Sequence, residues 1–129
     1  MAEDDDQFRQ RLHGTFIAEA KTHIDGIPSL LDKLKHGEGD GDALTELLRK
    51  IHSLKGAAGS VDQNQVELLC QSLEQVLRMV MRGERKIDAD FFDLFEQGLA
   101  LLESGLTTTA RDGKFMISLE FLSSVRKLT

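Results

Sequence analysis

Apolar residues recur every three or four positions along most of the chain, with polar residues between them. This spacing places the apolar side chains on one face of a helix. Runs that alternate apolar and polar residues, which are typical of strands, are few. The pattern therefore predicts an all-α fold of five helices, with an antiparallel four-helix bundle as its core.

The first helix is predicted to cover residues 6–35, with a kink or break near Gly26 and Pro28, because proline interrupts a helix. Residues 37–41 are predicted to form a loop, and Asp42 is predicted to cap the next helix. The inward face of the first helix is expected to consist of eight apolar residues: Phe8, Leu12, Phe16, Ala20, Ile24, Ile27, Leu31 and Leu34.

Two further helices are predicted to form an antiparallel hairpin around a polar turn at residues 62–65, and the second should end near Gly83. The core face of the first is expected to be Leu44, Leu47, Leu48, Ile51, Leu54 and Ala58. That of the second is expected to be Val66, Leu69, Cys70, Leu73, Leu77 and Val80.

Two helices should complete the chain. Asp88 is predicted to cap a helix whose core face is Phe91, Phe92, Phe95, Leu99 and Leu102. The last helix is predicted from about Gly113 to Leu128, presenting Phe115, Leu119, Leu122 and Val125. There is no internal repeat, and we expect one domain over residues 1–129.

His52, Lys55, Gly56 and Gly59 are spaced by three, four and seven positions, so they share a stripe on the shoulder of a helix. A glycine inside a helix costs about 1 kcal/mol relative to alanine. Two glycines beside a histidine therefore indicate that another group approaches the ring closely. We expect the ring of His52 to be anchored at its base and open at its tip, which suits a reactive group.

Glu74 is predicted to lie level with His52, because both are equidistant from Gln63 in the hairpin turn. A carboxylate beside an imidazole accepts the proton of Nδ1 and leaves the Nε2 lone pair free to attack. Lys55, one turn further along, can neutralise part of the charge of a phosphoryl group. These residue types predict a carrier that receives a phosphoryl group and passes it on.

The run HSLKGAAGS at residues 52–60, followed by LLCQSLE at 68–74, resembles the histidine phosphotransfer domain of two-component signalling. The flanks, including FIAEA at 16–20 and the segment 91–102, are most similar to the N-terminal phosphate-accepting domain of CheA-type chemotaxis histidine kinases. The resemblance covers nearly the whole chain. Two positions depart from a common family pattern: Gln71 stands where many members have histidine or another polar residue, and Asp62 where many have glycine.

The resemblance implies that His52 is phosphorylated, that Lys55 lies beside the phosphate, that Gly56 permits close approach, and that Glu74 holds the ring. It implies two partners: a kinase ATP-binding domain, which phosphorylates His52 in trans, and a CheY-like receiver domain, whose aspartate takes the phosphoryl group. The receiver is expected to dock around His52, on a surface made of Ser53, Gly56, Ala57, Gly59 and Gln71, with Val61 as a further apolar contact.

The chain lacks a glycine-rich nucleotide loop, so we expect ATP and magnesium to be used by the partner domains, with no cofactor or metal bound here. Whether the domain counts as an enzyme stays open, although its parent protein is expected to be a histidine kinase. The alternatives are a free-standing phosphorelay protein and a helical adaptor without chemistry. A hydrolytic pair of His52 and Glu74 is a weaker hypothesis, because no substrate anchor is identified.

Composition limits the partners and the cellular compartment that we expect for the protein. The chain has 129 residues and a net charge of −6, without a basic patch rich in aromatic residues, so nucleic acid is not an expected partner. One cysteine on a core face fits a reducing cytoplasm. No apolar stretch approaches the roughly 20 residues of a membrane span, and the acidic start is unlike a secretory signal. We expect a cytoplasmic and monomeric domain. The acidic loop 37–42 lacks the ligand spacing of a calcium site.

Overall fold

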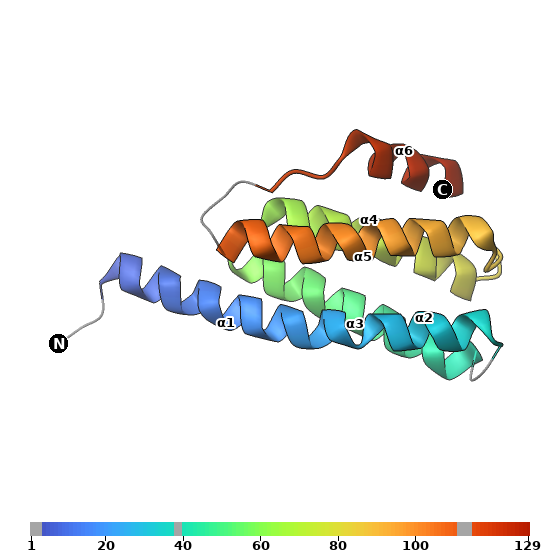
Figure 1. The fold of residues 1–129 in the computed structure, drawn as a ribbon, viewed down its shortest axis with the longest axis horizontal. Coiled ribbons are helices and arrows are strands. Elements are labelled where there is room, and N and C mark those ends of the chain that lie inside the picture. Colours follow the sequence, from blue (N-terminus) through green and yellow to red (C-terminus); the bar gives the residue numbers. More distant parts are fainter. Residues whose placement is uncertain (1–3, 38–39, 111–114) are drawn as a thin grey trace.

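The computed structural model describes residues 4–37, 40–110 and 115–129. Within these ranges all regular structure is helical, which confirms the all-α prediction (Figure 1). The helices are α1 (Asp5–Asp25), α2 (Ile27–Lys35), α3 (Asp40–Ser60), α4 (Asn64–Met81), α5 (Ala89–Ala110) and α6 (Leu119–Leu128).

Four helical rods surround one core and make up the bundle, and α1 and α2 together form one of these rods. The helices α1 and α2 follow one another along one side, and both pack against α3. In turn α3 packs against α4, α4 against α5, and α5 against α1, which closes the bundle. The last helix, α6, lies outside this ring against α4 and α5 (Figure 1).

The predicted break in the first helix is confirmed. Gly26 lies between α1 and α2, and its N–H donates to the carbonyl of His23 at 3.2 Å. Pro28 falls in the first turn of α2, where its missing N–H has no helical partner to lose. The expected first helix is thus two segments, α1 and α2, which brings the number of helical segments to six.

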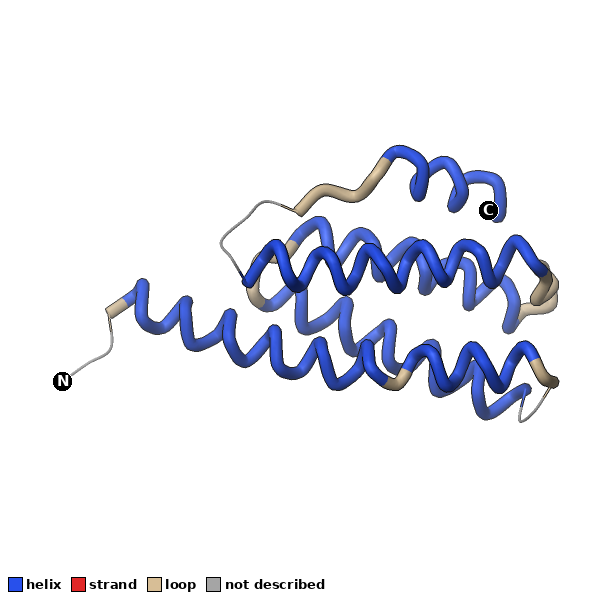
Figure 2. Tube along the Cα trace, in the orientation of Figure 1, coloured by secondary structure: helices blue, strands red, loops and turns tan. Residues whose placement is uncertain are grey.

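The inward face of α1 is correct from Phe16 onward but wrong at its start. Phe16 and Ala20 are buried, whereas Phe8 is 45% exposed and Leu12 37% exposed. Figure 2 shows the reason: the first turns of α1 extend past the ends of the neighbouring helices. Periodicity identifies which face of a helix is apolar, not how far its neighbours reach.

The prediction that Asp42 caps α3 is wrong, because α3 already begins at Asp40. Asp42 instead lies in the first turn, where a carboxylate interacts favourably with the helix dipole. The hairpin turn is confirmed, since α3 ends at Ser60 and α4 begins at Asn64. Asp62 has a φ of +59° in this turn, a left-handed conformation that aspartate tolerates better than most residues.

The limits of α4 and α5 agree with the prediction. Gly83, with a φ of +76°, follows the end of α4. Asp88 caps α5, accepting the N–H of Phe91 at 3.0 Å. The rings of Phe91 and Phe95, both buried, lie 4.6 Å apart between their centroids and fill the core.

The last helix begins later than predicted. It starts at Leu119, because the Ser118 side chain accepts the N–H of Phe121 at 3.1 Å and so caps it. Phe115 therefore belongs to a non-helical segment before α6. The predicted start at Gly113 lies outside the described residues.

The buried face of α6 also differs from the prediction. Val125 is buried as expected, together with Phe121 and Leu128. Leu119 is 83% exposed and Leu122 36% exposed, so the prediction that both face the core is wrong. Two apolar faces exist in this segment, and the face with Phe121, Val125 and Leu128 packs against the bundle.

Candidate functional site

His52 lies in the middle of α3 on its outer side. Its neighbours Ile51 and Leu54 are fully buried and fix the helix to the core. The His52 side chain itself is 62% exposed. The ring is thus held at its base and open to solvent, as the sequence predicts.

Glu74, on α4, lies beside this ring. It is only 6% exposed and is the one charged residue in the described part of the chain that is buried. Nδ1 of His52 lies 3.2 Å from Oε2 of Glu74. An ionised carboxylate can only accept, so Nδ1 carries the proton and donates it. The lone pair of the neutral ring is then on Nε2, on the far side of the ring from Glu74.

Two cations also contact the carboxylate of Glu74. Nζ of Lys55 lies 3.1 Å from Oε2 and 3.2 Å from Oε1. Arg78 donates to Oε1 from Nε at 3.1 Å and from Nη2 at 2.9 Å. Sequence reasoning missed Arg78, although its position four residues after Glu74 on the same helix is the usual spacing of an ion pair.

These donors decide the charge of Glu74. Burial by itself raises the pKa of its carboxyl group, because it disfavours the charged form. The hydrogen bonds from Arg78, Lys55 and His52 outweigh burial and lower the pKa below its ordinary value of 4.5. Glu74 is therefore ionised at neutral pH and serves as a fixed acceptor for the imidazole.

The two glycines of the stripe have different surroundings. A Cβ at Gly56 would meet no atom within 4 Å, so the surface there is open. A Cβ at Gly59 would lie 2.5 Å from Oε2 of Glu67, so this glycine makes room for a side chain of α4. Close approach from outside is thus possible at Gly56, whereas at Gly59 the end of the flexible Glu67 side chain lies against the backbone.

The other residues expected at a partner surface differ in exposure. Gln71 is exposed, one turn before Glu74 on α4. Ser53 is partly buried, and Ala57 and Val61 pack in part against the core.

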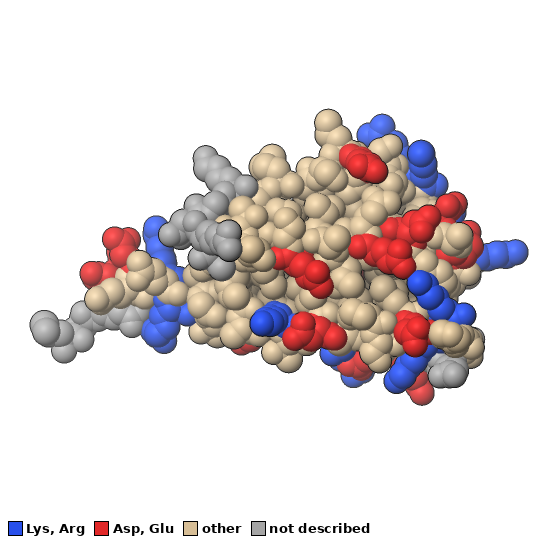
Figure 3. All heavy atoms as spheres, viewed as in Figure 1, with Lys and Arg blue, Asp and Glu red and all other residues tan. Residues whose placement is uncertain are grey.

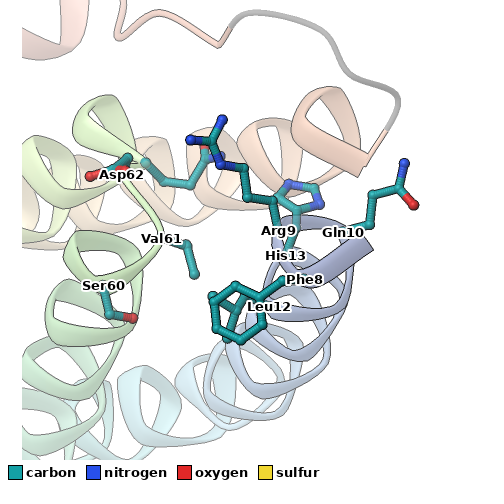
Figure 4. Close-up of a pocket in the computed structure, with 9 residues that line it drawn as sticks. Phe8, Arg9, Gln10, Leu12, His13, Ser60, Val61 and Asp62 are labelled. Atoms are coloured by element: carbon teal, nitrogen blue, oxygen red, sulfur yellow. The ribbon is translucent and has the colours of Figure 1, made fainter. Parts of the chain in front are cut away.

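A groove of about 640 Å³ lies elsewhere, between the projecting start of α1 and the α3–α4 turn (Figure 4). It is lined by Phe8, Leu12 and Val61 among others, and it includes neither His52 nor Glu74. The pair of His52 and Glu74 therefore lies on an open helix surface rather than in this groove.

Charged side chains of both signs are interspersed on the face shown in Figure 3, and basic ones do not gather into one patch there. Across the described ranges, no group of three or more histidine, cysteine, aspartate and glutamate side chains is arranged to hold a metal ion. No helix in the described part of the chain is long and apolar enough to cross a membrane.

A helical bundle that presents an open histidine, held by a buried carboxylate from the adjacent helix, defines a class of protein. The family model of the Hpt domain, the histidine phosphotransfer domain, matches residues 11–105. This match contains the whole of α3 and α4, and with them His52, Lys55, Glu74 and Arg78. The chain belongs to the Hpt domain family.

Among curated proteins, the chain is similar to the sensor histidine kinase CheAY of Helicobacter pylori, with 29% identity over 103 residues that cover 80% of this chain and 13% of that protein. It is 26% identical over 109 residues to the chemotaxis protein CheA of Borreliella burgdorferi, covering 84% of this chain and 12% of that protein. With CheA of Bacillus subtilis the identity is 28% over 105 residues, covering 80% and 16%. The chain thus spans between 12% and 16% of the length of these relatives. Family and relatives together support a histidine phosphocarrier of two-component signalling.

Proposed function

We propose that His52 is the residue that carries the phosphoryl group, receiving it from a kinase ATP-binding domain and giving it to an aspartate of a CheY-like receiver domain. One observation supports this most strongly: Nδ1 of His52 is 3.2 Å from Glu74, while the side chain remains 62% exposed. The hydrogen bond selects Nε2 as the nucleophile, and exposure gives a phosphodonor access to it.

In the first step, the Nε2 lone pair attacks the γ-phosphorus of ATP. The Nε2–P bond forms as the bond from this phosphorus to the β,γ-bridging oxygen breaks, and ADP leaves with that electron pair. The ring becomes an imidazolium that keeps its proton on Nδ1. Glu74 is placed to stabilise this positive charge, because its carboxylate already accepts that proton.

In the second step, a carboxylate oxygen of the receiver aspartate attacks the phosphorus. The Nε2–P bond breaks, its electron pair returns to Nε2, and neutral His52 is restored. The chain supplies no nucleotide site in this scheme: ATP and its magnesium ion come with the kinase domain, and a second magnesium ion with the receiver. The domain is a carrier, and the transferase activity belongs to its parent or partner.

The receiver is proposed to dock over Gly56, where the surface is open, with Ser53, Ala57 and Gln71 at the edge of the contact. We further propose that the chain is the N-terminal phosphate-accepting domain of a longer, cytoplasmic chemotaxis-type kinase. Its similarity to one part of much longer chemotaxis kinases supports this over a free-standing phosphorelay protein. A reading frame that ends at Thr129 in the gene would favour the free-standing protein instead.

The test is phosphorylation by the isolated ATP-binding domain of a CheA kinase with labelled ATP. We expect label that is labile in acid and stable in base, and its loss in His52→Gln. His36→Gln is the matched control, because this exposed histidine is the C-cap of α2, where its Nδ1 lies 2.8 Å from the Asp32 carbonyl oxygen. Label that survives His52→Gln would contradict the proposed site. An unlabelled wild-type protein, tested with several active kinase domains, would favour the adaptor.

A further inference from the structure

Two cations, Lys55 and Arg78, contact the carboxylate of Glu74, which carries a single negative charge. Oε1 accepts from Arg78 and from Lys55, and Oε2 accepts from His52 and from Lys55. Among the described residues, Lys55 is therefore the one donor shared by both oxygens. If it left, Oε1 would keep Arg78 and Oε2 would keep His52, so neither oxygen would lose its last hydrogen bond.

The two cations also differ in their freedom to move. Arg78 is four residues from Glu74 on the same helix and directs two nitrogens of its planar guanidinium at Oε1, at 3.1 Å and 2.9 Å. Such a rigid fork loses little entropy on holding this geometry. Lys55 carries a compact ammonium on a flexible stem and stands one turn from His52 on α3, so it can reach a group attached to that ring.

On these grounds, and resting on the proposed function of His52, we propose that Arg78 is a positioning residue that frees Lys55 for the phosphoryl group. In the unphosphorylated protein Lys55 is bound to Glu74. When the phosphoryl group arrives, the Lys55 ammonium moves to its oxygens, and Arg78 keeps Glu74 charged and in place behind the ring.

The charges agree with such an exchange. Glu74, Lys55 and Arg78 carry one negative and two positive charges, so one cation is in excess before phosphorylation. The phosphoryl group brings further negative charge, which the freed Lys55 can partly neutralise. Without Arg78, Lys55 would be the sole cation on a buried carboxylate and would be held there by the cost of leaving that charge unpaired.

The test uses phosphoramidate, a small phosphodonor that needs no docking surface, at pH 8. Arg78→Gln and Lys55→Gln should each slow phosphorylation of His52 by about tenfold, the value of one charge-assisted hydrogen bond. Because both changes remove the same contact, the double variant should be slower than either single variant by no more than about twofold. Arg78→Lys, which restores a cation, should recover part of the rate. Arg82→Gln is the matched control, since Arg82 pairs with Glu84 at 3.1 Å and not with Glu74.

A second readout follows Lys55 itself, through the NMR signal of its side-chain nitrogen. This signal should shift on phosphorylation of the wild-type protein and stay in place in Arg78→Gln. Equal shifts in both proteins, an unchanged rate in Arg78→Gln, or effects that multiply to about a hundredfold in the double variant would overturn the inference. Phosphorylation of the wild type at a residue other than His52 would instead overturn the proposed function.

Discussion

At the scale of single residues, Glu74 organises the site. A carboxylate that is 6% exposed is costly to bury, and here three side chains from α3 and α4 offset that cost. Its position is specific: one oxygen faces Nδ1 of His52, and the other faces Arg78. The buried charge thus fixes which ring nitrogen carries the proton.

Glu74→Gln should lower the free energy of unfolding by about 1–3 kcal/mol at pH 7, since it removes a charged acceptor from three donors. This loss of unfolding free energy should be smaller at acidic pH. The pKa of Glu74 is lower in the folded protein than its ordinary value of 4.5, so its contribution is complete above that value and fades as the pH falls towards the folded pKa. Urea unfolding at pH 7 and pH 3 measures the difference. Glu84→Gln, at an exposed ion pair, is the control, and an equal loss at both pH values for Glu74→Gln would contradict the electrostatic explanation.

At the scale of elements, the α3–α4 hairpin explains why much of the site is readable from sequence. Its register follows from the turn near Gln63, and this register places Glu74 beside His52. Arg78 is also readable in principle, because it is four residues from Glu74 on one helix. The contact of Lys55 with Glu74 is not readable from sequence. A flexible side chain can reach several acceptors, and which one it contacts depends on three-dimensional geometry.

Helix ends are where the sequence pattern was insufficient. In α6 the apolar residues fit two faces, and the face with Phe121 and Leu128 is the one that packs against α4 and α5. In α1 the apolar stripe continues to Phe8, although no neighbouring helix extends that far. Both differences concern what surrounds a helix, which its own periodicity does not contain.

The projecting start of α1 leads to a paired prediction. Phe16→Ala should cost about 3–5 kcal/mol in the free energy of unfolding, because it leaves a cavity in the core. Phe8→Ala should cost less than about 1 kcal/mol, because this ring is 45% exposed. Urea unfolding of both variants against the wild type measures the contrast. Similar losses would mean that the first turns of α1 are packed against the bundle after all.

The cap of α6 gives a second prediction at this scale. Ser118→Ala should lower stability by about 1 kcal/mol, the usual cost of losing an N-cap hydrogen bond. Ser123→Ala, inside the same helix on its exposed side, should be neutral or slightly stabilising, because alanine is the better helix former. Thermal unfolding followed by circular dichroism compares the two variants, and a neutral Ser118→Ala would show that the cap does not set the helix start.

At the scale of the whole molecule, the bundle has a closed core and an exposed surface that carries His52. The α6 helix covers α4 and α5 from outside, and α3 carries His52 on a side that remains exposed. Cys70 belongs to the core: it is buried on α4, one turn before Glu74. Burial, together with the nearby negative charge of Glu74, raises the pKa of its thiol to about 12.

The thiol of Cys70 should therefore react with a disulfide reagent at neutral pH only when the bundle opens. We expect the reaction to be slow in buffer and to accelerate with urea in parallel with unfolding. Leu119→Cys places a second thiol at a position that is 83% exposed, and this one should react at once. A rapid reaction of Cys70 without urea would show that α4 is less tightly packed than the structure indicates.

The central claim is that a buried carboxylate makes Nε2 of one exposed histidine the phosphoryl acceptor. It is tested most directly by NMR of the phosphorylated protein with nitrogen-15 in its histidines, through the coupling between phosphorus and ring nitrogens. The account predicts phosphorus bonded to Nε2 of His52, with a proton on Nδ1. Phosphorus on Nδ1 of His52, or on another histidine, would contradict it.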